Sequence, residues 1–332
     1  MKDFKLKTVG IEITWNCNQQ CSYCYLACDK NDYAEKKNMK LAFFRKILDK
    51  IWDAGIKDVY LIGGEPTLHP RFDEIVRMIG EYKWRKKGLC SNGVGLNEDM
   101  LNLIRTNFDY ISISVRGTES TTKIITKNEN SFHDTISALK KLSKSKIEIR
   151  IGIDLLPEYL NEFSKIIKLL KDNKINFKSV EIHRLIPIGN AKTKHVASIE
   201  EYRTLLKTID IISKKEKYSI KFEDSLPLCL FEKKYWKYIN ICKCGTSKIW
   251  IDPFGMARRC ACSSGAIGDI KKQSLRQIWN SKIMSKFRSF QWIDGKCKKC
   301  KVLGKCLGGC SSSRGVKFFK KDIFSDFIQT IR

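Results

Sequence analysis

Residues 17–24 read Cys17-Asn18-Gln19-Gln20-Cys21-Ser22-Tyr23-Cys24, a loop that follows directly after the β-rich run Val9 to Thr14. Its three cysteines have the spacing C-x3-C-x2-C. Three thiolates at this spacing can bind three irons of a [4Fe-4S] cube and leave the fourth iron open, whereas an electron-carrier ferredoxin normally supplies a fourth cysteine. An open iron can hold a substrate or cosubstrate. The alternative is a zinc site that takes Cys28 as its fourth ligand, although this spacing is unusual for zinc.

The sequence around this loop alternates between short β-rich runs and helical patterns up to about residue 217, as in successive βα units around a parallel sheet. The candidate strands are Val9 to Thr14, Asp58 to Ile62, Gly88 to Ser91, Tyr110 to Val115, Ile147 to Asp154 and Ser179 to Leu185. Two helices are clear from apolar residues at i, i+3, i+4 and i+7, which are Phe44, Ile47, Leu48 and Ile51, and Phe163, Ile166, Ile167 and Leu170. Six βα units are too few for a closed eight-stranded barrel, so we predict an α/β fold with an open, partial (β/α)6 TIM-like barrel.

Beyond about residue 218 the alternation stops, and Cys, Gly and Lys dominate short segments that are too sparse in aliphatic residues to build their own core. Such a region usually needs a metal to fold. We therefore predict two domains, a partial barrel over residues 1–217 and a Cys-rich iron-sulfur cluster-binding extension over residues 218–332.

The composition limits the classes of partner. The 332 residues carry 63 Lys and Arg against 36 Asp and Glu, a formal net charge of +27, but the lysines are scattered and no nucleic-acid recognition module is legible. A nucleic-acid partner is therefore disfavoured. The chain has neither a run of roughly eighteen apolar residues nor a signal peptide, which argues against a membrane and for a cytoplasmic location. In that compartment, fourteen cysteines indicate iron-sulfur or metal ligation rather than disulfides.

A second motif, Gly63-Gly64-Glu65-Pro66, follows the second predicted strand. Its glycines let a backbone approach a ligand closely, and Glu65 can accept hydrogen bonds from an ammonium group. Together with the cysteine loop and Tyr23, this segment resembles the radical S-adenosylmethionine (SAM) enzymes. The resemblance implies that Cys17, Cys21 and Cys24 hold a [4Fe-4S] cluster whose open iron binds the amino and carboxylate groups of SAM. An electron from the cluster then cleaves SAM to a 5′-deoxyadenosyl radical.

Three further segments are similar to SAM-binding segments of that family: Ser91-Asn92-Gly93, Ser112-Ile113-Ser114-Val115-Arg116-Gly117 and Arg184-Leu185-Ile186-Pro187-Ile188-Gly189-Asn190-Ala191. The resemblance therefore places SAM against Tyr23, Gly63, Gly64, Glu65, Asn92, Ser114 and Leu185. In this arrangement Ser114 reaches the ribose and the backbone near Leu185 flanks the adenine. Arg116 stands where the family usually has an acidic residue.

Cys90 lies near the carboxyl end of its predicted strand, at the same edge of the sheet as the cysteine loop. It is either a small buried hydrophobe or a thiol that hands a hydrogen atom to a substrate radical.

The C-terminal cysteines form a second pattern. Cys244 is followed by ten residues, Gly255, four residues and Cys260, and later by Cys297-x2-Cys300-x5-Cys306-x3-Cys310. This pattern resembles the SPASM extension of radical SAM enzymes, which carries auxiliary [4Fe-4S] clusters. The resemblance assigns Cys244, Cys260 and Cys310 to a first auxiliary cluster, with Cys242 favoured over Cys229 as the upstream ligand. It assigns Cys297, Cys300 and Cys306 to a second.

No cysteine follows Cys310, although the family pattern ends with one more. The second cluster therefore has an open iron, or Cys262 or another residue closes it, or the site holds something else. A zinc ion on Cys297, Cys300, Cys306 and Cys310 is the remaining alternative, because paired cysteines also fit zinc.

The resemblance implies a radical SAM enzyme that abstracts a hydrogen atom from its substrate, uses one or two auxiliary clusters, and takes electrons from a reductant such as flavodoxin or ferredoxin. A ribosomally made peptide that is crosslinked, epimerised or given a thioether is the favoured substrate, and a +27 enzyme attracts an acidic leader. Only about eight residues precede the first strand, so we expect no N-terminal leader-recognition domain. The alternatives are a small-molecule dehydrogenase, epimerase or decarboxylase, and a metal-binding nucleic-acid module. Sulfatase maturation is disfavoured, because Ala261 stands where that branch carries its acidic base.

Overall fold

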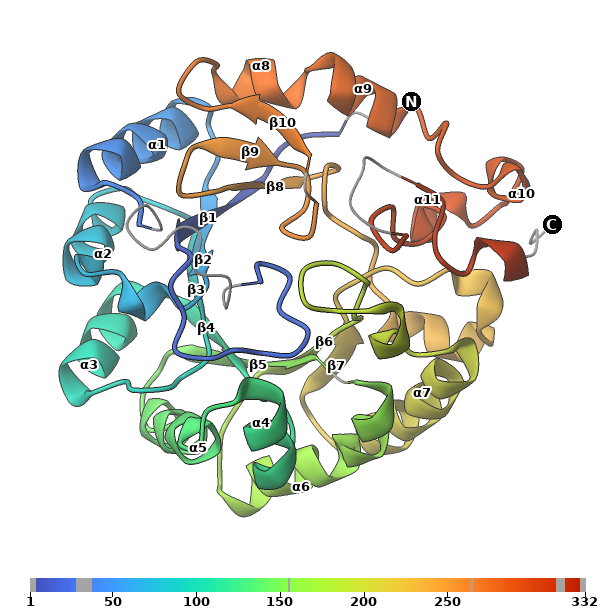
Figure 1. Ribbon diagram of the computed structural model, residues 1–332, viewed down its shortest axis with the longest axis horizontal. Helices are drawn as coiled ribbons and strands as arrows, with labels where there is room; N and C mark the ends of the chain where they lie inside the picture. Colours follow the sequence, from blue (N-terminus) through green and yellow to red (C-terminus); the bar gives the residue numbers. More distant parts are fainter. Residues whose placement is uncertain (1–3, 28–37, 155, 264, 315–319, 329–332) are drawn as a thin grey trace.

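The computed structural model describes residues 4–27, 38–154, 156–263, 265–314 and 320–328. In this part of the chain the strands form one sheet in the order β10-β9-β8-β1-β2-β3-β4-β5-β6-β7, and helices surround it (Figure 1). The strands are β1 Thr8–Thr14, β2 Asp58–Gly63, β3 Lys86–Ser91, β4 Tyr110–Ser114, β5 Glu148–Asp154, β6 Ser179–His183, β7 Ser219–Phe222, β8 Lys248–Ile251, β9 Met256–Arg258 and β10 Ala266–Asp269. Strands β1 to β7 run parallel in chain order, β8 pairs parallel with β1, and β9 is antiparallel to β8 and β10.

The larger helices follow the strands as βα units. They are α1 Leu41–Asp53, α2 Phe72–Gly80, α3 Glu98–Asn107, α4 Glu119–Thr126, α5 Ser131–Leu142, α6 Phe163–Asp172 and α7 Ile199–Ser213. Shorter helices come later, namely α8 Leu275–Trp279, α9 Lys282–Arg288, α10 Gly295–Lys298 and α11 Leu303–Cys306. The 3-10 turns are η1 Pro66–Leu68, η2 Pro157–Glu162, η3 Thr193–His195, η4 Leu228–Leu230, η5 Lys233–Tyr238 and η6 Ser325–Phe327. No helix in the described ranges has the length and apolar character needed to cross a bilayer.

The open, partial barrel predicted from the sequence is confirmed. All six predicted strands occur within two residues of their expected ends. The apolar stripes of both predicted helices are buried, over Phe44, Ile47, Leu48 and Ile51 in α1 and over Phe163, Ile166, Ile167 and Leu170 in α6.

The region beyond residue 218 is expected to be a separate Cys-rich extension, but part of it adds strands to the sheet of the barrel. β7 adds to β6, and β8 pairs with β1 on the other side of the sheet. Ile249, Ile251 and Ile278 from this region belong to the same apolar core as the barrel strands. The predicted boundary at 217/218 falls just before β7, and the division into two domains stays a prediction.

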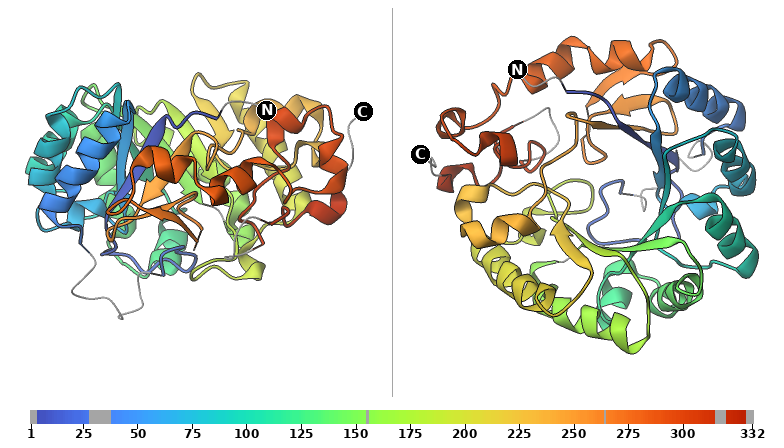
Figure 2. Two further views of the ribbon diagram at one scale, coloured as in Figure 1. Left: turned by 90° about the horizontal axis from the view of Figure 1, so that it is seen from above. Right: turned by 180° about the vertical axis from the view of Figure 1, so that it is seen from behind.

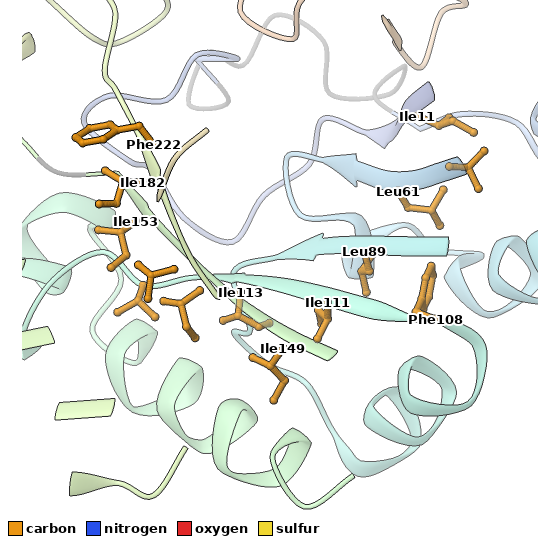
Figure 3. Packing of buried hydrophobic residues seen from close by; sticks show 14 of the residues in the cluster. Ile11, Leu61, Leu89, Phe108, Ile111, Ile113, Ile149, Ile153, Ile182 and Phe222 are labelled. Carbon is orange, nitrogen blue, oxygen red and sulfur yellow. The ribbon is translucent and has the colours of Figure 1, made fainter. Parts of the chain in front are cut away.

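Alternate residues of each strand face opposite sides of the sheet. Figure 3 shows Ile111, Ile113 and Ile149 on the side that faces the helices. The opposite face of the strands turns toward the barrel interior. There the ring of Tyr110 occupies the space that a Cβ at Gly88 would need. At Gly88 the interior between β3 and β4 is thus filled by a protein side chain.

Candidate active site

The cysteine loop lies at the carboxyl end of β1 and is held from two sides. The backbone N–H of Gln20 donates to the carbonyl of Thr126 at the end of α4, with an N···O distance of 2.8 Å. On the other side, the N–H of Asn190 donates to the carbonyl of Cys24 at 2.9 Å. Because helix α4 and the loop after β6 both form hydrogen bonds with the cysteine loop, the barrel itself holds the three cysteines in place.

The three thiols of this loop lie close together. Burial and the neighbouring carboxylate of Glu65 raise the pKa of the Cys17 thiol to about 12, and the thiols of Cys21 and Cys24 add to this shift. Burial raises the pKa of Cys21 to about 11, while the Arg116 guanidinium opposes the shift. Metal ligation requires thiolates, so binding iron here releases protons. Three converging sulfurs, with no fourth cysteine among the described residues of the loop, fit a cube with one open iron.

Glu65 connects the ends of two strands. Its Oε1 accepts the hydroxyl hydrogens of Thr67 at 2.7 Å and Ser91 at 2.9 Å, and its Oε2 accepts the backbone N–H of Asn92 at 2.7 Å. The side chain is wholly buried, and burial raises its pKa although these donors oppose the shift. Both oxygens therefore already accept hydrogen bonds from the protein. Sequence reasoning missed this role, which is to position the loop after β3 beside the loop after β2.

Asn92 links Glu65 to the cysteine loop. Its Nδ2 donates to Asn18 Oδ1 at 2.7 Å and lies 3.9 Å from the sulfur of Cys17. Its Oδ1 accepts the backbone N–H of Val94 at 2.8 Å. The structure thus brings Asn92 next to the first cysteine, and its contact with SAM stays a prediction.

Gly63 and Gly64 approach protein backbone. A Cβ at Gly63 would collide with the carbonyl of Thr14, and one at Gly64 with the carbonyl of Asn16. In addition, the N–H of Gly64 donates to the carbonyl of Thr14 at 2.8 Å. The sequence interpretation assigned this close approach to a ligand. The structure places the backbone that leads into Cys17 there instead.

A small apolar cluster flanks the cysteine loop. It contains Cys21, Tyr23, Ile125, Leu156, Leu185 and Ala191. Leu185, the expected neighbour of the adenine, therefore lies on the same side of the loop as Tyr23.

Gly189 explains why the loop after β6 needs a glycine. Its φ is +57°, and a Cβ there would collide with the carbonyl oxygen of Cys24 and approach that of Tyr25 to 2.6 Å. Only glycine adopts this conformation without strain and leaves room for the neighbouring backbone.

We expect Gly189→Ala to cost roughly 1–3 kcal/mol of stability, from the left-handed backbone and the displaced loop. It should also lower the iron content, because Cys24 must move. Thermal unfolding and iron analysis of the reconstituted protein measure the two effects. Gly55→Ala is the matched control: Gly55 has a φ of +74°, but no atom lies within 4 Å of the added Cβ. Equal iron loss in both variants would contradict the packing argument.

Arg116, which departs from the family pattern, forms an ion pair with Asp154 at the end of β5. Its guanidinium also donates to the hydroxyl of Tyr23 at 3.3 Å and lies over the Tyr23 ring. Arg116 is thus paired with an acidic residue of the neighbouring strand, a pairing that no local motif could reveal.

Ser114 and Cys90 lie on the interior face of the sheet. Ser114 ends β4 and faces Gly152 across the β4–β5 pair. Cys90 is the next-to-last residue of β3. Burial and the Glu181 carboxylate raise the pKa of the Cys90 thiol to about 12, which keeps its S–H intact. An intact S–H suits both the donor and the packing interpretation.

A polar cluster of Glu12, Trp15, Tyr25 and Arg258 lies between the cysteine loop and the C-terminal cysteines, and we call it the Glu12 cluster. Glu12 is wholly buried, pairs with Arg258 and accepts the indole N–H of Trp15 at 2.8 Å on Oε2. Its Oε1 and the hydroxyl of Tyr25 are buried without a hydrogen-bond partner in the described part of the chain. Buried polar atoms without partners are rare in native proteins, so this cluster is a candidate ligand site.

The C-terminal thiols separate into two groups. The first contains Cys242, Cys244, Cys260, Cys262 and Cys310. Within it, the neighbouring thiols of Cys242 and Cys260 raise the pKa of Cys244, and the neighbouring thiols of Cys244 and Cys262 lower the pKa of Cys260. The second contains Cys229, Cys297, Cys300 and Cys306.

This separation bears on the alternatives that the sequence leaves open. Cys229 lies with the second group and Cys262 with the first, which favours Cys242 over Cys229 as the upstream ligand of the first cluster and disfavours Cys262 as the closing ligand of the second. Cys310 lies with the first group, which disfavours the zinc site on Cys297, Cys300, Cys306 and Cys310. Among the described residues, no three His, Cys, Asp or Glu side chains are placed to hold one metal ion. Every described cysteine is a thiol rather than a disulfide, and Cys28 lies outside the described residues.

Comparison with known proteins gives matches over most of the chain. The radical SAM superfamily model matches residues 11–170, and the model of the SPASM iron-sulfur cluster-binding domain matches residues 242–301. The subtilosin biosynthesis protein AlbA of Bacillus subtilis (strain 168) is 24% identical over 328 residues, which cover 95% of this chain and 69% of AlbA. The cysteine-type anaerobic sulfatase-maturating enzyme of Clostridium novyi (strain NT) is 25% identical over 329 residues, covering 91% and 87%.

Solved structures share the fold. SuiB of Streptococcus suis bound to SAM matches with a TM-score of 0.75 at 19% identity, over 97% of this chain and 77% of SuiB. The same protein with its precursor peptide SuiA gives 0.74 at 18% identity, over 97% and 76%.

The groups of thiols found in this structure suit the cofactors of the matched families. One group of three leaves an iron open for SAM, and the two C-terminal groups consist of cysteine alone, the usual ligand of iron-sulfur clusters. The protein is thus an enzyme that uses SAM, a SAM-binding [4Fe-4S] cluster and auxiliary iron-sulfur clusters. The chain belongs to the radical SAM superfamily and carries a C-terminal SPASM domain.

Proposed function

We propose that this enzyme modifies a ribosomally made peptide, with SAM held by the cluster on Cys17, Cys21 and Cys24. When bound and reduced, that pair of cofactors supplies a 5′-deoxyadenosyl radical that abstracts a hydrogen atom from the substrate. The residues of this chain position the cysteine loop and SAM. Asn92 and Glu65 fix the loop beside Cys17, and Leu185 and Tyr23 give SAM an apolar neighbour. Cys90 keeps its hydrogen at neutral pH and stays available as a donor.

The observation that carries the proposal is the Glu12 cluster. Glu12 Oε1 is an acceptor, and the hydroxyl of Tyr25 both donates and accepts. A backbone amide of a peptide offers the complementary N–H and C=O. Tyr25 follows Cys24 by one residue, and its hydroxyl lies near both Glu12 and the thiol of Cys262. A peptide held there would lie between the site of SAM cleavage and the first auxiliary group.

Two further facts support a peptide. AlbA is named for bacteriocin biosynthesis, and SuiB was solved with a precursor peptide. The net charge of +27 favours an acidic partner, since charge complementarity speeds association and suppresses wrong partners. Ala261 follows Cys260, so the acidic base of the sulfatase-maturing branch is missing at that position.

The proposal is tested with anaerobically reconstituted enzyme, dithionite and SAM. 5′-Deoxyadenosine formation separates an enzyme of this type from a binding module. Binding of a synthetic Glu-rich peptide is then compared with a Lys-rich peptide of equal length at two salt concentrations. We expect tighter, salt-sensitive binding of the acidic peptide, because exposed charges are screened by salt. Equal affinities would favour the small-molecule alternative.

Tyr25→Phe tests the substrate role of the Glu12 cluster. Removal of an unpartnered buried hydroxyl should leave the thermal midpoint unchanged or raise it, because its desolvation is no longer a cost. The loss of a hydrogen bond to substrate should raise KM about fivefold. Tyr235→Phe, a buried tyrosine in η5 outside the site, is the control. A lower thermal midpoint with unchanged KM would show that the hydroxyl is structural.

A further inference from the structure

The second cysteine group draws its thiols from two distant parts of the chain. Cys297, Cys300 and Cys306 come from α10, α11 and the turn between them, whereas Cys229 comes from η4. The gold part of the ribbon, which contains η4 and η5, can be followed toward the red C-terminal part in Figure 1 and in the right panel of Figure 2, and the packing of Cys229 against the cluster around Cys297 shows that the two parts meet. This arrangement brings a fourth thiol to three that the sequence pattern already groups.

Packing places Cys229 next to Cys297. Cys297 belongs to a small apolar cluster with Phe287, Trp292, Ile293 and Ile328, and Cys229 packs against this cluster. Burial, together with the smaller effects of the thiols of Cys306, Cys229 and Cys300, raises the pKa of Cys297 to about 12. All four sulfurs therefore share one neighbourhood.

Hydrogen bonds fix η4 against Cys306. The hydroxyl of Ser225 donates to the carbonyl of Cys306 at 2.9 Å. The backbone N–H of Leu228, the residue before Cys229, donates to the sulfur of Cys306. Because Ser225 is buried, this attachment is part of the core.

The chain directs Cys310 away from this group. Gly308 and Gly309 both have positive φ, +75° and +89°, and form a turn directly after α11. The N–H of Cys310 then donates to Asp322 Oδ2 at 2.6 Å, and its thiol lies beside those of Cys242 and Cys260. The turn thus places Cys306 in the second cysteine group and Cys310 in the first.

We propose that Cys229 is the fourth ligand of the second auxiliary [4Fe-4S] cluster, together with Cys297, Cys300 and Cys306. It takes the place of the cysteine missing after Cys310. Each of the four thiols gives up its proton on binding iron. A cube with four cysteine ligands has no open iron, so this cluster transfers electrons and does not bind substrate. The inference rests on the cofactors and not on the identity of the substrate.

The test uses protein in which Cys17, Cys21 and Cys24 are alanine, so that only auxiliary iron is counted. The parent should hold about eight irons per chain, from two cubes of four. Cys229→Ala should lose between one and four of them, with loss or conversion of one of the two auxiliary EPR signals. Cys90→Ala, a buried thiol outside both groups, should keep all of them. About eight irons and an unchanged EPR spectrum in Cys229→Ala would overturn the proposal.

A second variant covers failure of the first to fold, which circular dichroism and gel filtration reveal. Cys229→Ser keeps the shape of the side chain but offers oxygen, a harder ligand than sulfur. The proposal requires either loss of iron from this variant or a shifted EPR signal of one auxiliary cluster. An unchanged signal overturns it. Cys262→Ala should keep about eight irons, because four thiols remain in the first group. The proposal would also be overturned if Cys262→Ala lost about four irons while Cys229→Ser kept all of its iron.

Discussion

Cleavage of SAM should disappear, together with about four of about twelve irons, when Cys17, Cys21 and Cys24 all become alanine. The two C-terminal groups keep their ligands, so about eight irons should remain. The physical reason is that these three sulfurs alone leave an iron open for SAM. 5′-Deoxyadenosine is measured after anaerobic incubation with dithionite.

The remaining iron serves as the folding control for this variant. If the protein were merely unfolded, the auxiliary irons would be lost as well. Continued formation of 5′-deoxyadenosine by the triple variant would exclude these cysteines as the SAM-cleaving site.

Asp322→Ala should be severely destabilising, by about 3–5 kcal/mol. The Asp322 carboxylate and the Arg184 guanidinium form an ion pair in which both side chains are fully buried, with an N···O distance of 2.7 Å. Removing the acid leaves a buried cation without its counter-charge. Asp322 also accepts the backbone N–H groups of Cys310 and Phe324. Thermal unfolding should show a midpoint lower by roughly 5–15 °C.

Asp326→Ala is the matched control, because it lies in the same segment and pairs with Arg314 at the surface. Asp326 is 81% exposed, so its loss should cost less than about 1 kcal/mol. Similar midpoints for the two variants would show that the buried pair contributes little. Asp322→Asn, which keeps the shape but removes the charge, separates the loss of charge from the loss of packing.

Local pattern was sufficient for β1 to β6, because short strand-like runs alternate there with amphipathic helices, even though β3 has no β-branched residue. It was not sufficient for β7 and β8. Ser219–Phe222 has four residues, two of them polar, and Lys248–Ile251 follows closely after Cys244, so neither looks like part of a barrel. Their place is fixed by pairing with strands far away in the sequence.

The site divides in the same way. Three cysteines within eight residues define their own geometry, whereas the bond from Glu65 to Asn92 depends on two loops meeting. The pairing of Arg116 with Asp154 and the placement of Cys229 beside Cys297 depend on side chains that only the folded sheet brings together. Spacing within a loop can be read from sequence, but contacts between loops need the fold.

The pairing of β8 with β1 has a consequence for truncation. β1 carries the cysteine loop at its end and has a neighbour on each side, β2 and β8. A fragment that stopped after β7 would turn β1 into an edge strand with a row of unsatisfied N–H and C=O groups, and such edges invite aggregation. A fragment that ends after β7 is therefore a poor candidate for separate expression, because the strand that leads into its iron ligands would become an exposed, aggregation-prone edge strand.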